Sequence, residues 1–259
     1  MREIYFDNSA TTKPYPEVVE LMTKTLTEDY GNPSSKHTKG FEAEKYFRHA
    51  REQVAATLKV KPKEIIFTSG GTESNNTVIF GTAMAKRKQG KHIISSAFEH
   101  AAIYRPLDVL VELGYEVTYL PVDAKGHISL EDLRTAIRPD TILVTIMTIN
   151  NEMGAIEPIE DIGRIVKEQN PNTWFHTDAI QAYGKIPLRP KLQHVDMLSV
   201  SGHKLHGPKG VGFLYKDEKI RLRPLIYGGG QQEDMRSGTH DVPGIAGLGL
   251  AAEMSCTGL

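Results

Sequence analysis

EIIFTSGGTESNN, residues 64–76, joins a short β-branched run to a glycine-rich turn and then to a helical pattern. The same alternation of short apolar runs and longer amphipathic segments continues as far as residue 177. Strands are expected at residues 64–68, 91–95, 116–120, 141–147 and 173–177, and helices at 72–88, 100–113, 130–137 and 159–168. This alternation predicts an α/β fold in which helices cover the faces of a mostly parallel sheet.

The segments on either side of this unit extend the same fold. Residues 16–26 and 40–58 have the apolar spacing of helices, and Pro16 suits a first helical turn. Residues 196–200 and 211–215 are expected to form a closing pair of strands. The stretch YGGGQQEDMRSGT, residues 227–239, is polar and rich in glycine, so we expect a loop there.

The composition narrows the class of protein. The chain has 259 residues, 39% hydrophobic and 24% charged, with a formal net charge of -1, which is typical of a globular protein without a nucleic-acid footprint. Its amino terminus has no apolar signal core and no window is long enough to span a bilayer, so we expect a cytoplasmic protein without a membrane partner. The single cysteine, Cys256, excludes an internal disulfide framework and a cysteine-rich zinc site.

Five of the expected strands are followed directly by distinctive polar clusters. The clusters are TSGGTESNN (68–76), SSAFEH (95–100), TINNEMG (148–154), HTDAIQ (176–181) and SGHK (201–204). In an open α/β sheet, ligands bind outside the carboxyl ends of the strands. The five clusters are therefore expected to converge on one edge of the sheet.

Each cluster also has an ordinary structural interpretation when it is taken alone. TSGGTESNN offers the glycines, hydroxyls and helix start that a phosphate needs, yet it lacks the Gly-Lys-Ser/Thr ending of a nucleoside-triphosphate loop and could be a capped helix start. Asp178 could be a helix cap, and His100 could be a surface helix residue. Asn151 and Gln181 could merely satisfy loop backbone.

Together with Lys204, however, the clusters match the needs of one ligand. A phosphate cradle, a carboxylate, a histidine, two amides and a lysine would lie side by side. Pyridoxal phosphate (PLP) needs a phosphate site, an acid against its pyridinium nitrogen and a lysine that forms a Schiff base. The sequence therefore predicts a PLP site.

The sequence resembles the class V, fold-type I PLP enzymes, and within them the NifS/IscS-like cysteine desulfurases. The resemblance lies in YFDNSATT, GNPSSKHTKG, TSGGTESNN, EH at 99–100, NNEMG, HTDAIQAYGK, SGHKLHGPKG and MRSGT, which run in family order from residue 5 to about 247. It implies a three-layer PLP-transferase large domain over residues 16–247, preceded by an amino-terminal segment, residues 1–15. Residues 248–259 would begin a carboxyl-terminal small domain that is largely missing.

The resemblance also implies a role for each site residue. Lys204 would hold PLP as an internal aldimine, Asp178 would keep the pyridine nitrogen protonated, and His100 would stack on the ring and carry protons. Contacts to the phenolic oxygen would come from Asn151 and Gln181, and contacts to the phosphate from Gly71, Thr72, Ser201, His203 and, across a homodimer, Thr239 of the neighbouring subunit. A zinc site through HKLH is the alternative for His203, although a third ligand is lacking.

The function implied is that of a cysteine desulfurase, which converts L-cysteine to L-alanine and passes the sulfur to an acceptor or scaffold protein for iron-sulfur cluster or thio-cofactor biosynthesis. A selenocysteine lyase, an aminotransferase and a non-catalytic PLP-binding remnant are the alternatives. In the family the persulfide-forming cysteine lies far downstream of the lysine, whereas Cys256 lies close to Lys204 in sequence. We interpret Cys256 as part of a flexible tail, and expect the chain alone to be inactive or poorly active.

Overall fold

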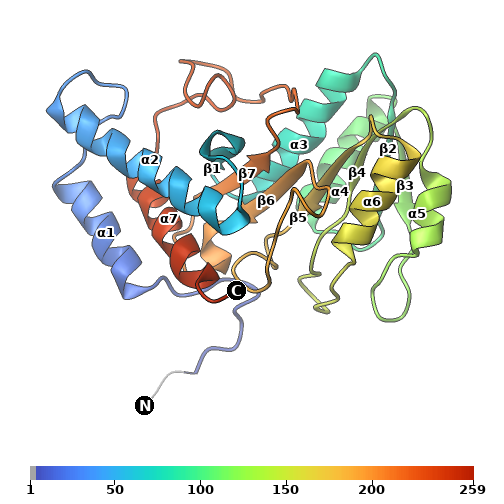
Figure 1. Cartoon of the computed structure of the whole chain (residues 1–259), viewed down its shortest axis with the longest axis horizontal. Helices are drawn as coiled ribbons and strands as arrows, with labels where there is room; N and C mark the ends of the chain where they lie inside the picture. Colours follow the sequence, from blue (N-terminus) through green and yellow to red (C-terminus); the bar gives the residue numbers. More distant parts are fainter. Residues whose placement is uncertain (1–3) are drawn as a thin grey trace.

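A single seven-stranded sheet forms the centre of the structure, a computed structural model that describes residues 4–259 (Figure 1). Its strands are β1 (Ile65–Thr68), β2 (His92–Ser96), β3 (Glu116–Leu120), β4 (Thr141–Thr145), β5 (Trp174–Asp178), β6 (Met197–Ser201) and β7 (Gly212–Lys216). The spatial order is β1-β7-β6-β5-β4-β2-β3, and only β7 runs against its neighbours. The predictions of a mostly parallel sheet and of a closing pair of strands are confirmed, and the structure shows that this pair, β6 and β7, is antiparallel.

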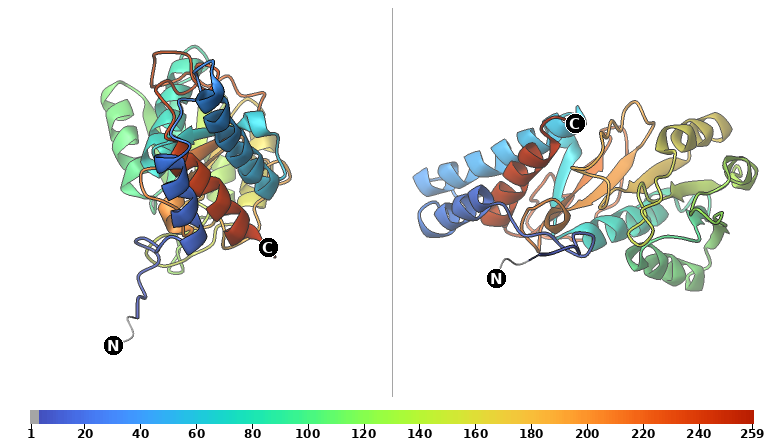
Figure 2. Two further views of the ribbon diagram at one scale, coloured as in Figure 1. Left: turned by 90° about the vertical axis from the view of Figure 1, so that its left-hand side faces the viewer. Right: turned by 90° about the horizontal axis from the view of Figure 1, so that it is seen from below.

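The helices cover both faces of this sheet. They are α1 (Pro16–Thr27), α2 (Thr38–Leu58), α3 (Gly71–Lys86), α4 (Ala101–Glu112), α5 (Leu130–Ala136), α6 (Ile159–Gln169) and α7 (Val242–Cys256), with short 3-10 turns η1 (Pro62–Glu64) and η2 (Gly202–Lys204). In the right-hand view of Figure 2, α3 and α4 lie below the sheet and α6 lies above it. The chain therefore has the three layers that the alternating pattern predicts.

Two separate apolar cores explain why the strands read as continuous hydrophobic runs. On β1, Ile65 and Phe67 belong to the core shared with α2, α6 and α7, whereas Ile66 belongs to the core shared with α3 and α4. On β6, Leu198 and Met197 divide in the same way. Because successive side chains of a strand point to opposite faces, a strand buried on both faces has no polar alternation.

Helix α7 extends further than the sequence indicates. It runs unbroken from Val242 to Cys256 and packs against α2, where a Cβ on Gly249 would lie 2.6 Å from the Cα of Ala50. Leu248 is fully buried on this helix. The expected boundary between residues 247 and 248 therefore falls inside a packed helix. The prediction that Cys256 lies in a flexible tail is wrong, because the apolar face of α7 is held in the core up to this residue.

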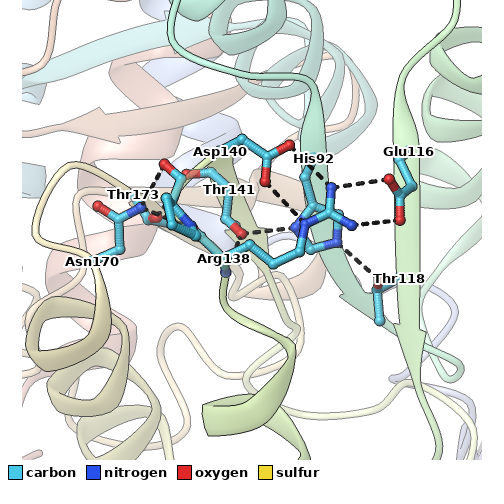
Figure 3. A network of polar contacts seen from close by, with 9 residues as sticks. His92, Glu116, Thr118, Arg138, Asp140, Thr141, Asn170 and Thr173 are labelled. Carbon is cyan, nitrogen blue, oxygen red and sulfur yellow. Dashed lines mark hydrogen bonds and ion pairs between the residues drawn. The ribbon is translucent and has the colours of Figure 1, made fainter.

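A polar network joins β2, β3 and β4 near their amino ends (Figure 3). His92, the first residue of β2, bonds the hydroxyls of Thr141 on β4 and Thr118 on β3 through its two ring nitrogens, at 2.7 and 2.8 Å. Burial lowers the pKa of His92, which favours the neutral ring. Beside it, Arg138 donates two hydrogen bonds to Glu116. This network fixes the amino ends of the strands, away from the predicted site.

Within residues 4–259, no helix combines the length and the apolar character that a membrane crossing requires.

Candidate active site

The five polar clusters meet in one cavity of about 380 Å³ at the carboxyl ends of β1, β2, β4, β5 and β6. Although β1 is antiparallel to β7, it runs in the same direction as β6, so its polar cluster reaches the same edge. Nine of the ten predicted cofactor-binding residues line this cavity: Gly71, Thr72, His100, Asn151, Asp178, Gln181, Ser201, His203 and Lys204. The tenth, Thr239, is exposed in the loop between β7 and α7 and is not among the lining residues.

The glycine-rich turn lets the chain pass from β1 into α3 close to the cavity. Gly70 has a φ of +146°, a conformation that residues with a side chain rarely adopt. A Cβ on Gly71 would lie 2.0 Å from Cδ1 of Ile180, so a side chain there would push into the cavity wall. The amino end of α3, with its free backbone N–H groups and positive dipole, is thereby presented beside Thr72 and Ser201. This arrangement suits a phosphate.

An ion pair that the sequence reasoning missed ties the MRSGT loop to this turn. Glu73, in the first turn of α3, accepts hydrogen bonds from Nε and Nη2 of Arg236 at 3.0 and 3.3 Å and from the N–H of Ser69 at 2.7 Å. Gln232, in the same loop, pairs with both backbone groups of Phe67 on β1. The loop is therefore anchored to the edge strand and to the phosphate-binding turn.

Asp178, the last residue of β5, is buried, with only 4% of its surface exposed. Its Oδ1 accepts the N–H of Ile180 at 3.0 Å, and its Oδ2 accepts Nδ2 of Asn75 at 2.7 Å. Burial raises the pKa of Asp178, and the two hydrogen bonds, with the charges of His100 and Lys204, act against that rise. Asn75 lies in the quoted TSGGTESNN stretch, but nothing in the sequence distinguishes it from Asn76.

His100 both caps a helix and faces the cavity. It is the N-cap of α4, and its Nδ1 accepts the N–H of Ala102 at 3.0 Å. The neutral ring therefore carries its proton on Nε2. The two interpretations of this residue are compatible, because the cap fixes the ring while the ring lines the cavity.

A buried carboxylic acid lies directly before this histidine. Oε1 of Glu99 accepts the N–H of Met147 at 2.9 Å and the hydroxyl of Ser96 at 2.8 Å. Burial raises the pKa of Glu99 to about 8. The charges of Asp178 and Glu157 add to the effect of burial, so the group is largely protonated at neutral pH. The sequence gives no sign of this, because the shift arises from burial and from carboxylates that are distant in the chain.

The amino-terminal segment covers Lys204. Nζ of Lys204 donates to the carbonyl of Ala10 at 2.7 Å and also to that of Ser9. Burial lowers the pKa of Lys204, while the charges of Asp7 and Asp178 oppose that effect. A lower pKa favours the free amine, which is the nucleophilic form. Sequence reasoning missed the wall formed by this segment, although YFDNSATT was among the matching strings.

The two amides, Asn151 and Gln181, line the same cavity. Nε2 of Gln181 donates to the carbonyl of Ser9 at 2.9 Å, so Gln181 does satisfy loop backbone while it lines the cavity. Nδ2 of Asn151 donates to Oε1 of Glu152 at 2.7 Å. Both side chains can still contribute further hydrogen bonds to a ligand.

The two histidines of HKLH form hydrogen bonds with the amino-terminal segment. Nδ1 of His203 lies 3.1 Å from Oγ1 of Thr11, and Nδ1 of His206 donates to the carbonyl of Lys13 at 2.9 Å. Across residues 4–259, no group of three or more His, Cys, Asp or Glu side chains is arranged to hold a metal ion.

Cys256 lies in a different cavity from Lys204. This second cavity, of about 220 Å³, is lined by Thr57, Tyr183 and Arg189 among others. Burial raises the pKa of the Cys256 thiol, which disfavours the thiolate. The thiol is thus neither on a mobile tail nor beside the amine.

Comparisons with known proteins agree with this geometry. The family model for aminotransferase class V matches residues 4–258. A putative cysteine desulfurase, IscS 1, from Bacillus subtilis is 47% identical over 98% of this chain and 67% of its own length. The cysteine desulfurase IscS of Dictyoglomus turgidum is 49% identical over 98% of this chain and 64% of its own length. The chain thus spans about two thirds of the length of these relatives.

Solved structures show the same relationship. A NifS-like protein superposes with a TM-score of 0.96 at 46% identity, covering 98% of this chain and 70% of the other. SspA in complex with cysteine superposes with a TM-score of 0.93 at 42% identity, covering 97% of this chain and 72% of the other. Because the family model matches nearly the whole chain and these relatives are 42–49% identical to it, this chain belongs to the class V aminotransferase family, on its NifS/IscS-like cysteine desulfurase branch.

Proposed function

We propose that the chain binds PLP through Lys204 and serves a cysteine desulfurase reaction, in which L-cysteine yields L-alanine and its sulfur passes to an acceptor. The observation that carries the proposal is the meeting, in one cavity, of an amine with a lowered pKa, a buried carboxylate and a helix amino terminus. Each of these groups answers one requirement of PLP.

The residues divide the work by their chemistry. When bound, PLP supplies a protonated pyridine ring that withdraws electrons from the α-carbon of an amino acid. Asp178 would hold the proton on the ring nitrogen, because it is the one buried carboxylate among the lining residues that the structure describes. Lys204 would attach the cofactor and move a proton at the α-carbon, and His100 would lie against the ring with Nε2 free to donate.

The amino end of α3 would hold the phosphate. Gly71 and Thr72 offer backbone and hydroxyl groups there, with Ser201 and His203 opposite. Burial and the neighbouring lysines lower the pKa of His203, so it binds as a neutral donor. Thr239, exposed and outside its own cavity, is available to the phosphate of a neighbouring subunit, which makes a homodimer part of the proposal.

The cavity described here performs the cofactor chemistry, and sulfur acceptance needs a further thiol. Cys256 is not suited to that task, because it lies in a separate cavity and burial raises its pKa. Cysteine is favoured as the substrate because the structural neighbour SspA is in complex with cysteine. An acceptor or scaffold protein and a cytoplasmic location complete the proposal.

Borohydride reduction of the chain mixed with PLP tests the attachment. Peptide mapping should find the pyridoxyl group on Lys204, and Lys204→Arg should abolish the label. Lys185→Arg is the matched control, because Nζ of Lys185 donates to the carbonyl of Gln181, a residue of the cavity, and the pKa of Lys185 is lowered first by burial and then by the charge of Lys204. A label on Lys185, or no label on the wild type, would count against the proposal.

Asp178→Asn tests the role of the carboxylate separately. The variant should keep the label on Lys204, since the attachment does not need the acid. It should exchange the α-proton of cysteine with solvent at a small fraction of the wild-type rate, because a neutral partner no longer holds the ring proton. NMR of the substrate in deuterated water measures this exchange, and a wild-type rate would remove Asp178 from the role.

A further inference from the structure

Asn75 is the only side chain within residues 4–259 that donates a hydrogen bond to Asp178. It lies one turn into α3, is fully buried, and places Nδ2 2.7 Å from Oδ2 of the carboxylate. The other oxygen is satisfied by the N–H of Ile180, a backbone group of the loop that follows β5. One donor thus belongs to the loop that follows β5, and the other belongs to α3, which covers one face of the sheet.

The rest of the Asn75 amide is poorly satisfied. Its Oδ1 is buried and has no hydrogen-bond partner among the residues that the structure describes. A buried acceptor without a partner costs stability, and such groups are rare enough in native proteins to need an explanation. An apolar residue of similar size would avoid this cost. The asparagine is therefore poorly explained by stability and well explained by its contact with Asp178.

The orientation of the amide follows from the carboxylate. If Oδ1 of Asn75 faced Asp178, two acceptors would meet without a proton between them. Only Nδ2 can face the anion, and it can do so only while Asp178 is ionised or carries its proton on another lone pair. The contact thus keeps the proton off the lone pair of Oδ2 that faces Asn75, favours the ionised carboxylate and fixes its orientation.

We propose that Asn75 is a positioning residue, which holds the Asp178 carboxylate ionised and fixed in orientation beneath the cofactor ring. The inference deepens the proposed function, since it assigns the group that prepares Asp178 for the pyridine nitrogen. A carboxylate that accepts two N–H bonds keeps a lone pair free on each oxygen for a third partner. Asn75 acts through Asp178 and is not itself placed at the reacting atoms.

The surroundings of Asp178 act on its pKa in opposite directions, so one more hydrogen bond can shift its ionisation. His100, at the start of α4, and Lys204, after β6, lower the pKa of Asp178 by their charge, while burial raises it. Glu99, after β2, is protonated at neutral pH because burial raises its pKa to about 8, so it adds little competing negative charge. Asn75 is uncharged, and it influences Asp178 only by its donor.

The titration of Asp178 tests the inference without cofactor. Carboxyl carbons of aspartate are labelled with ¹³C, the Asp178 resonance is assigned by its loss in Asp178→Asn, and its shift is followed with pH. Asn75→Leu should make protonation of Asp178 at least about tenfold more favourable, because one hydrogen bond to a charged group is lost. Thr82→Val is the matched control. Thr82 is fully buried on the same helix, and its hydroxyl has no partner within residues 4–259. An Asp178 titration that is the same in Asn75→Leu and wild type would overturn the inference.

A measurement on the wild-type chain covers the case in which Asn75→Leu does not fold. The side-chain amide protons of Asn75 should exchange slowly with solvent, and their shifts should follow the ionisation of Asp178. In Asp178→Asn that pH dependence should disappear. Amide protons that exchange freely, or whose shifts do not follow Asp178, would contradict the inference.

Borohydride labelling of Lys204 separates this inference from the proposed function. If the wild type carried no label, the proposed function would be contradicted, while the titration of Asp178 would still test the role of Asn75. With the label present, Asn75→Leu should exchange the substrate α-proton slowly at low pH and recover as rising pH ionises Asp178. A defect that is equally deep at every pH would mean that Asn75 is merely structural.

Discussion

Replacement of Glu99 by Gln should remove a pH-dependent loss of stability. In the wild type, burial raises the pKa of Glu99 from about 4.5 to about 8, while in the unfolded chain the group titrates normally. Between these values the folded chain binds the proton more tightly than the unfolded chain. The free energy of unfolding must therefore fall as the pH rises from about 4.5 to about 8.

The size of this effect follows from the two pKa values. A difference of about 3.5 pH units, at about 1.36 kcal/mol each, corresponds to about 5 kcal/mol, or about 3 kcal/mol if the folded value is a unit lower. A glutamine resembles the protonated acid, since its Oε1 can accept the bonds from Met147 and Ser96 in the same way. Its amide would replace Oε2, which is buried and has no partner in the described part of the chain.

Urea unfolding at pH 5 and pH 8.5 measures the difference, with the fluorescence of the single tryptophan, Trp174, as the signal. Glu99→Gln should match the wild type within about 1 kcal/mol at pH 5 and exceed it by about 3–5 kcal/mol at pH 8.5. Glu112→Gln, on the exposed side of α4, is the control and should leave both values unchanged. An equal effect of Glu99→Gln at both pH values would refute the assignment of a buried, protonated acid.

Three further predictions concern the cofactor, the subunit contact and the thiol. Gly71→Ala should weaken PLP binding about tenfold or more in a titration of the cofactor-free chain, because its Cβ would meet Ile180 at 2.0 Å, and an unchanged Kd would contradict the phosphate cradle. Thr239→Ala should weaken PLP binding but keep the label on Lys204, with a dimer in sedimentation; a strictly monomeric, PLP-loaded wild type would end the proposal of a shared site. Cys256→Ser should leave sulfide release at the low level of the wild type, and brisk release that this variant abolishes would make Cys256 the sulfur acceptor.

Much of the fold was predictable from the sequence because its signals are local. The runs EIIFT and TILVT are continuously apolar or β-branched, a pattern typical of strands that are buried on both faces. The structure has β1 and β4 at these positions. The polar clusters were placed correctly for a related reason. Where strands run in one direction, the residues that follow them must share an edge, whatever the order of the strands. Nine of the ten residues that the clusters and the resemblance named for the cofactor accordingly line one cavity, and their roles there stay predictions.

Contacts between distant segments were not predictable, because no local pattern encodes them. The carbonyls of Ser9 and Ala10 meet Lys204 across more than 190 residues, and the sequence offered a matching string there but no partner. The prediction that Cys256 lies in a flexible tail was wrong for a similar reason. Its place near the end of the printed sequence suggested a tail, whereas the packing of α7 on α2 decides that it is half-buried.

The sequence by itself determined the layers, the edge that carries the site and the types of chemical group gathered there, since periodicity and residue type are local properties. Only the tertiary structure decided the charge state and orientation of those groups. Asn75 and Asn76 are adjacent and chemically identical, yet about 100° of helix rotation separates them, and the packing of α3 against the sheet turns only Asn75 toward Asp178. Likewise Glu99 is an ordinary glutamate in the sequence, and it becomes a buried acid because the ends of β2 and β4 close around it and remove its water.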